Sequence, residues 1–72
     1  MTGMHDTFKY HLIVNGSVVH VGITNDLNRR LQEHQQQFGA NARIVQQGPP
    51  TTRKAALEWE NEQRRLGMPT GP

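Results

Sequence analysis

The chain has 72 residues, of which 33% are hydrophobic, and its eight Lys and Arg residues against six Asp and Glu residues give a net charge of +2. A chain of this length forms one small domain with a thin hydrophobic core. It contains no cysteine, which excludes disulfides and thiolate zinc sites. No apolar run approaches the roughly 20 residues that span a bilayer and no signal peptide is visible, so we expect a cytoplasmic protein without a membrane partner.

The first predicted elements are two antiparallel strands joined by a tight turn. Residues 8–14 alternate between the two faces of a strand, and residues 17–23 are rich in β-branched side chains. Between them, the pair Asn15-Gly16 favours a short hairpin turn because both residue types tolerate positive φ. Residues 1–7 are polar or small, and we expect them to form a flexible N-terminal segment.

A basic amphipathic helix is predicted over residues 26–37. Thr24, Asn25 and Asp26 can each cap this helix, Asp26 also favours a helix N-terminus through its charge, and Gly39 suits a left-handed residue that ends the helix. On its surface, Arg29 and Glu33 stand four residues apart and are expected to pair. Its apolar residues share one side of the predicted helix: Leu27, Leu31 and Phe38.

A short third strand is predicted over residues 41–47, followed by a second helix that starts at Thr51 or Thr52 and runs to Leu66. Residues 68–72 are expected to form a tail. The residues that recur at helical spacing on the inward side of this helix are Ala56, Trp59, Glu60, Gln63 and Leu66.

The predicted order of elements is β-β-α-β-α over residues 8–67. This order favours a small α+β domain in which a three-stranded, mostly antiparallel sheet is flanked by helices. Fold alone does not identify a function, so the functional argument depends on particular side chains.

Several side chains that could take part in catalysis are expected to lie close together at one end of this sheet. Tyr10 and His20 lie on paired strands, and Arg30 and His34 lie one helical turn apart. Glu60 lies on the inward flank of the last helix. Hydrolysis of a phosphodiester needs a base, a cation near the phosphoryl oxygens and a divalent ion held by a carboxylate. A single carboxylate suits Mg²⁺, which keeps most of its water ligands.

Four segments of the chain resemble the motifs of a known family and follow one another in the same order. Residues 8–10 are Phe-Lys-Tyr, residues 20–22 are His-Val-Gly, residues 22–34 run from Gly-Ile-Thr-Asn-Asp to Glu-His, and residues 56–60 are Ala-Leu-Glu-Trp-Glu. Together they resemble the GIY-YIG nuclease domain over nearly the whole chain, and the block at residues 22–34 is the closest match. At position 20 the family usually has tyrosine rather than histidine.

The resemblance implies a role for each of these side chains. It implies that Arg30 stabilises charge on the phosphate, that Glu60 holds one Mg²⁺ or Mn²⁺ ion, and that Tyr10 lies in the active site. His34 matches a histidine found one turn beyond the arginine in many members. His20 takes the place of a tyrosine proposed as the general base or its helper, and an imidazole suits that task at neutral pH.

We therefore expect a small metal-dependent endonuclease that hydrolyses single- or double-stranded DNA with little sequence specificity. The side chains expected to contact nucleic acid are Lys9, Arg29, Arg30 and Arg53. Two other interpretations remain open: a non-catalytic nucleic-acid-binding module of the same family, and a protein-interaction domain that uses the helix carrying Trp59 and Arg64-Arg65. The oligomeric state is also open.

Overall fold

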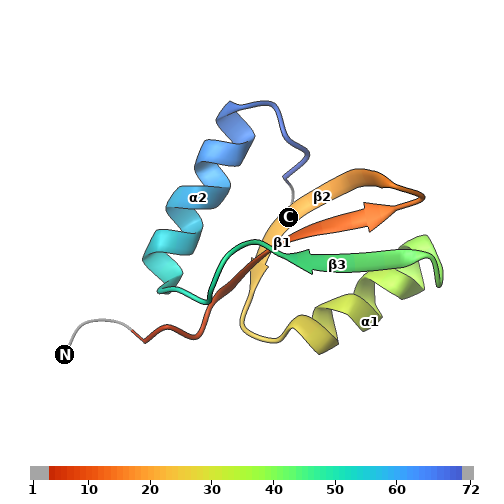
Figure 1. Cartoon of the computed structure of the whole chain (residues 1–72), viewed down its shortest axis with the longest axis horizontal. Coiled ribbons are helices and arrows are strands. Elements are labelled where there is room, and N and C mark those ends of the chain that lie inside the picture. Colours follow the sequence, from red (N-terminus) through yellow and green to blue (C-terminus); the bar gives the residue numbers. More distant parts are fainter. Residues whose placement is uncertain (1–3, 71–72) are drawn as a thin grey trace.

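The structure is a computed structural model that describes residues 4–70. Its elements are β1 (Phe8–Val14), β2 (Ser17–Thr24), α1 (Leu27–Phe38), β3 (Ala42–Gln46) and α2 (Arg53–Arg65), as Figure 1 shows. This order and the α+β class are the ones that the sequence predicted, and each boundary lies within one or two residues of its predicted position.

The sheet has the strand order β2-β1-β3, so β1 is the central strand. Both pairings are antiparallel, and they place Tyr10 of β1 opposite Gly22 on one side and Gln46 on the other. The turn between β1 and β2 has Asn15 at φ 53° and Gly16 at φ 81°, which are the positive φ values that this dipeptide was expected to adopt. The turn alone would place Tyr10 opposite Val21, but the register shifts by one residue between Leu12 and Ile13, and this shift places Tyr10 opposite Gly22.

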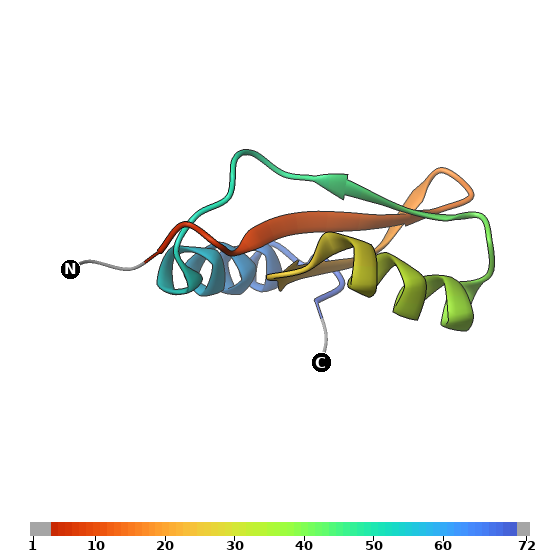
Figure 2. The same ribbon diagram turned by 90° about the horizontal axis from the view of Figure 1, so that it is seen from below.

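The two helices pack on different strands. α1 contacts β3 and β1, whereas α2 contacts β2 and β1. Figures 1 and 2 both show the helices lying toward different ends of the sheet rather than against each other. The central core consists of Tyr10, Leu12 and Ala42, all almost fully buried, with Leu27 and Ile44 among the residues packed around it.

Neighbouring residues of β1 face opposite sides of the sheet, as the period of a strand requires. The hydroxyl of Tyr10 forms a hydrogen bond with the His34 ring in α1. The ring of His11 instead stacks on the ring of Trp59 in α2, with the ring centres 6.1 Å apart. This separation of His11 from Tyr10 follows from the strand alternation in the sequence. The two helices thus contact the central strand from opposite faces.

Both helices begin at side-chain caps. Asp26 Oδ1 accepts a hydrogen bond from the Arg29 amide at 3.0 Å, and Thr52 Oγ1 accepts one from the Ala55 amide at 3.1 Å. These caps satisfy amide donors that have no partner within the helix. Gly39 follows α1 at φ 94°, so the predicted positive φ is confirmed, although its ψ of 176° is not left-handed helical.

On both helices, the row of residues that faces the core is shorter than the helical spacing of the sequence predicted. Phe38 is 39% exposed and Leu66 is 65% exposed, although both were expected to face the core. Phe38 is the last residue of α1, and Leu66 is the C-cap of α2. Each lies where its helix ends. The helical spacing of apolar residues continues to this position, but the side chains against which the helix packs do not extend that far.

The chain ends are tied to the sheet more closely than predicted. Thr7 was assigned to a flexible segment, but it is 3% exposed and pairs with Thr51 through two backbone hydrogen bonds of 2.9 and 2.8 Å. In the predicted tail, Thr70 forms a bridge with Val21 of β2. Residues 1–3 and 71–72 of these two predicted segments lie outside the described residues. Within the described range, neither helix has the length and hydrophobicity that a membrane crossing requires.

Candidate active site

A small pocket of about 90 Å³ lies between the first two strands and the two helices. Its lining contains all five side chains that the sequence selected as catalytic: Tyr10, His20, Arg30, His34 and Glu60. Gly22 and Ile23 of β2 complete the lining. The fold therefore brings together side chains that are up to 50 positions apart in the chain.

Tyr10 lies at the base of this site. Its side chain is 2% exposed, and its hydroxyl lies 2.9 Å from His34 Nε2. The ring crosses the backbone of β2 at Gly22, where a Cβ atom would lie 2.6 Å from Tyr10 Oη. A glycine is needed at position 22 because any larger residue would collide with the tyrosine hydroxyl.

Burial strengthens the preference of Tyr10 for its protonated form. It raises the pKa of the phenol from 10.0 to about 12, against the opposing influence of the Arg30 guanidinium. The phenol, which is protonated at neutral pH even at its ordinary pKa, is held more firmly in that form. In that state it stabilises neighbouring groups through its hydroxyl, and it is a poor general base.

The two histidines lie next to this hydroxyl. The ring centres of Tyr10, His20 and His34 are 5.3–6.1 Å apart. Burial is the main reason that the pKa of His20 and that of His34 lie below the ordinary value of 6.5. The Glu60 carboxylate opposes this shift at His20, whereas the charge of His20 and then that of Arg30 lower the pKa of His34 further. Both imidazoles are thus neutral at pH 7, which leaves each with a nitrogen able to accept a proton.

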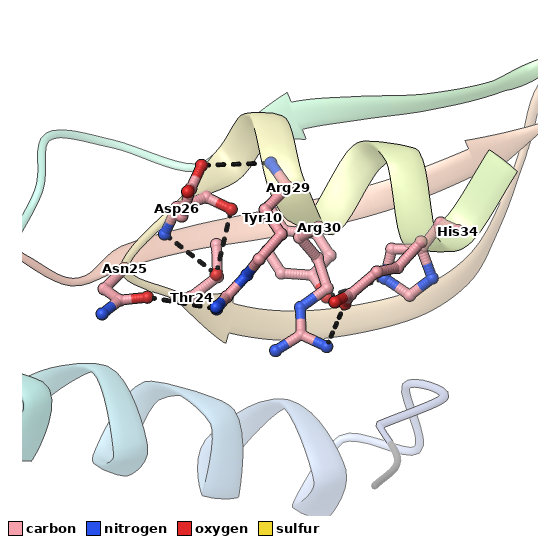
Figure 3. A network of polar contacts seen from close by, with 8 residues as sticks. Tyr10, Thr24, Asn25, Asp26, Arg29, Arg30 and His34 are labelled. Atoms are coloured by element: carbon pink, nitrogen blue, oxygen red, sulfur yellow. Dashed lines mark hydrogen bonds and ion pairs between the residues drawn. The ribbon is translucent and has the colours of Figure 1, made fainter. Parts of the chain in front are cut away.

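Arg30 and Arg29 have different surroundings, as Figure 3 shows. Arg29 reaches back to the start of α1, where its NH2 group donates to Asn25 Oδ1 at 3.4 Å. Arg30 lines the pocket, and its NH1 group donates to Glu33 Oε1 at 3.0 Å. The predicted pair between Arg29 and Glu33 is wrong, because Glu33 bonds to the arginine three residues away on its own side of the helix.

The Nε atom of Arg30 is buried and has no hydrogen-bond partner among the described residues. A buried N–H donor without a partner is costly in a folded protein. An acceptor oxygen entering the pocket, such as a phosphate oxygen, would satisfy it. This donor is the clearest sign in the structure that the pocket suits an anionic ligand.

Glu60 reaches the pocket from α2. Neither of the two ion pairs found among residues 4–70 includes it. No group of three or more His, Asp or Glu side chains in this range is arranged to hold a metal ion. A lone carboxylate fits the coordination habit of Mg²⁺, which retains waters and uses substrate oxygens as further ligands. Glu60 is the residue that would hold such an ion.

The structure does not bring together the four side chains expected to contact nucleic acid. Arg29 and Arg30 lie in the first turn of α1. Lys9 lies on the opposite face of β1 from Tyr10, with its Nζ atom 5.9 Å from the centre of the Trp59 ring. Arg53 starts α2 and lines a separate open pocket that also contains Asp6. Only the two arginines of α1 are next to the candidate site.

Two features of the site were not found from the sequence. The pairing of Glu33 with Arg30 had a signal in their three-residue spacing, which places them on one helix face. The carbonyl of Pro69 accepts a hydrogen bond from the Val21 amide at 2.8 Å, between His20 and Gly22. That contact has no local signal, because it joins backbone atoms of distant segments.

Comparison of the chain with protein-family models, with curated proteins and with solved structures finds no match. The motifs in the sequence and the geometry of the pocket are therefore the features that bear on function.

Proposed function

We propose that this protein is a metal-dependent endonuclease of the GIY-YIG type that hydrolyses phosphodiester bonds in DNA. The observation that carries the proposal is the shared lining of one pocket by Arg30 from α1, Glu60 from α2 and two neutral histidines. A cation, a carboxylate and a proton acceptor within one small pocket are the groups that this hydrolysis requires.

Each side chain has a defined part in the proposed reaction. The neutral imidazole of His20 accepts the proton of the attacking water, since Tyr10 is protonated at neutral pH. The free Nε–H of Arg30 binds a phosphoryl oxygen as negative charge develops there. A Mg²⁺ or Mn²⁺ ion held by Glu60 would polarise the phosphate and stabilise the leaving group.

Contacts with the DNA are proposed to be mainly with its backbone, through Arg29 and Arg30, and to have little sequence specificity. Such contacts weaken as salt concentration rises, because they release counterions from the phosphates. The proposal includes a cytoplasmic location. The proposed substrate covers both single- and double-stranded DNA.

The test is a cleavage assay on single- and double-stranded DNA with Mg²⁺ or Mn²⁺, using two pairs of matched variants. Arg30→Ala is compared with Arg29→Ala, its neighbour, which is bonded to Asn25. Glu60→Gln is compared with Glu58→Gln, which changes an exposed carboxylate on the same helix. At saturating DNA we expect cleavage to fall by about 100-fold or more in Arg30→Ala and Glu60→Gln, and to stay close to that of the unmodified protein in Glu58→Gln. Arg29→Ala should weaken DNA binding but change the rate at saturating DNA far less than Arg30→Ala does.

The assay also separates the alternative functions. Full activity in Glu60→Gln would remove the carboxylate from the reaction. DNA binding that weakens with salt, without cleavage in either metal, would instead establish a non-catalytic binding module. If the protein neither cleaves nor binds DNA, a protein-interaction domain is left, although Trp59 of the helix in question is already stacked on His11.

A further inference from the structure

We propose that His20 and His34 together bind one transition-metal ion that prefers imidazole ligands, such as Zn²⁺, within the candidate pocket. The site would be distinct in its donors from the oxygen ligand that Glu60 offers to Mg²⁺. Its existence does not depend on nuclease activity, whereas its effect on DNA cleavage rests on the proposed function.

The spacing of the two imidazoles matches that of two ligands on one ion. Their ring centres lie 5.3 Å apart, with an angle of 52° between the ring planes. A tetrahedral Zn²⁺ ion has Zn–N distances of about 2.0–2.1 Å, and a ring nitrogen lies about 1.1 Å from the ring centre, which puts two bound rings about 5 Å apart. The pair is therefore already at the separation that an ion requires.

One nitrogen of each ring lies close to residues that line the pocket. His34 Nε2 is 2.9 Å from Tyr10 Oη. A Cβ atom built on Gly22 would lie 2.6 Å from that same oxygen and 3.1 Å from His20 Nε2. Both Nε2 atoms thus lie close to the part of the pocket that Tyr10 and Gly22 line.

The pocket has room for an ion and its remaining ligands. Its volume of about 90 Å³ exceeds the roughly 30 Å³ that one water occupies in the liquid. Because the described residues offer no third ligand in a ready-made cluster, water completes the coordination. Imidazole nitrogen favours Zn²⁺, Cu²⁺ and Ni²⁺ over Mg²⁺, which prefers oxygen. The histidine pair and the carboxylate therefore select different classes of ion.

Binding would have a direct consequence for the proposed reaction. An ion on Nε2 of His34 displaces the hydrogen bond from Tyr10, and an ion on His20 occupies the nitrogen that accepts a proton from water. A bound Zn²⁺ ion is therefore expected to inhibit cleavage supported by Mg²⁺.

The primary test is calorimetric titration of the full chain with Zn²⁺ in the absence of DNA. We expect one ion per chain, and an affinity at least about tenfold weaker in His20→Gln and in His34→Gln, since even residues that only support metal ligands change affinity by this much. The matched controls are His11→Gln, on the opposite face of the sheet, and His5→Gln, near the start of the chain. Their affinity should equal that of the unmodified protein.

Equal affinity in His20→Gln or in His34→Gln would overturn the proposal, as would lost binding in either control. A nuclear magnetic resonance measurement on the unmodified protein keeps the test decisive if His34→Gln fails to fold. On addition of Zn²⁺, the ring nitrogens of His20 and His34 should shift together while those of His5 and His11 do not. A shift confined to other histidines would also overturn the proposal.

A second measurement separates this proposal from the nuclease. If the protein cleaves DNA, saturating Zn²⁺ should lower the rate with Mg²⁺ by at least about tenfold. An unchanged rate with Zn²⁺ bound would overturn inhibition at this site. A protein that binds Zn²⁺ through the histidine pair but never cleaves DNA would refute the nuclease and retain the metal site.

Discussion

The hydroxyl of Tyr10 lies 2.9 Å from Nε2 of His34, which joins the central strand of the sheet to helix α1. The bond connects residues 24 positions apart in the sequence, in a part-buried environment. It holds the His34 imidazole over the pocket and aligns the tyrosine ring across Gly22. Both the stability of the domain and the shape of the site depend on it.

Replacement of Tyr10 by Phe removes this bond while keeping the buried ring. We expect the free energy of unfolding to fall by about 1 kcal/mol, the typical net contribution of one hydrogen bond in a protein. Urea denaturation followed by circular dichroism measures the change. An unaltered free energy of unfolding would show that the bond contributes nothing to stability.

The stability of the protein is expected to depend on pH through His20 and His34. Burial lowers the pKa of both imidazoles below 6.5, so in acid the unfolded chain binds protons more readily than the folded chain. The two histidines therefore make the free energy of unfolding rise with pH up to about 6.5. Their contribution is lost as the pH falls from 6.5 through their lowered pKa values. Urea denaturation at several pH values between about 5 and 8 measures this slope.

The variant His20→Gln should reduce the slope, whereas His5→Gln should leave it unchanged, since His5 is exposed. A slope that is the same in His20→Gln and in the unmodified protein would contradict the role assigned to burial of His20.

Replacement of Gly22 by Ala is expected to destabilise the fold and to displace Tyr10. The added Cβ atom would lie 2.6 Å from the tyrosine hydroxyl, and the ring, which is 2% exposed, has no free space to enter. Overpacking of this kind typically costs about 1–3 kcal/mol. Thermal or urea denaturation measures the loss.

The control for this change is Gly16→Asn in the hairpin turn. A Cβ atom at Gly16 would meet no atom within 4 Å, and asparagine tolerates its φ of 81°. This variant should change the free energy of unfolding by less than about 0.5 kcal/mol. Gly22 is not among the glycines with positive φ, so the contact with Tyr10 is the reason for glycine there, and a loss in Gly22→Ala no larger than in Gly16→Asn would contradict that reason.

The contact of the tail with β2 is expected to protect the backbone between His20 and Gly22. Arg64 Nε donates to Thr70 Oγ1 at 3.0 Å, beside the bond from the Val21 amide to the Pro69 carbonyl. Arg64→Ala should therefore raise the hydrogen-exchange rate of the Val21 amide severalfold, since loss of an exposed bond costs about 1 kcal/mol.

Arg65→Ala provides the comparison, because Arg65 bonds to Glu62 in the same helix and not to the tail. Exchange at Val21 should be the same in Arg65→Ala and in the unmodified protein. If both variants raised the rate equally, the effect would come from α2 as a whole and not from the tail.

The sequence predicted the elements of this fold accurately where the signal is local. The alternation in Phe8–Val14, the turn at Asn15-Gly16 and the groups of capping residues that include Asp26 and Thr52 all act through a few neighbouring residues. Such preferences are present in the chain before it folds. The same local preferences assign the five candidate catalytic side chains to their strands and helices. All five line one pocket in the structure.

Tertiary structure decided the features that depend on distant partners. It fixed Thr7 against Thr51 and the tail against Val21, where the sequence predicted free ends. It left Phe38 and Leu66 exposed because their helices extend beyond their packing partners. Pairing and burial of this kind depend on which segments meet, and no spacing within one segment contains that information.

The same division applies to the candidate site. The sequence by itself determined which residue types stand on each strand and helix. Only the folded chain lowered the pKa of the histidines and left Arg30 Nε without a partner among the described residues. The physical reason is that periodicity orients a side chain relative to its own backbone, whereas desolvation and hydrogen bonding depend on the atoms that other segments bring to it.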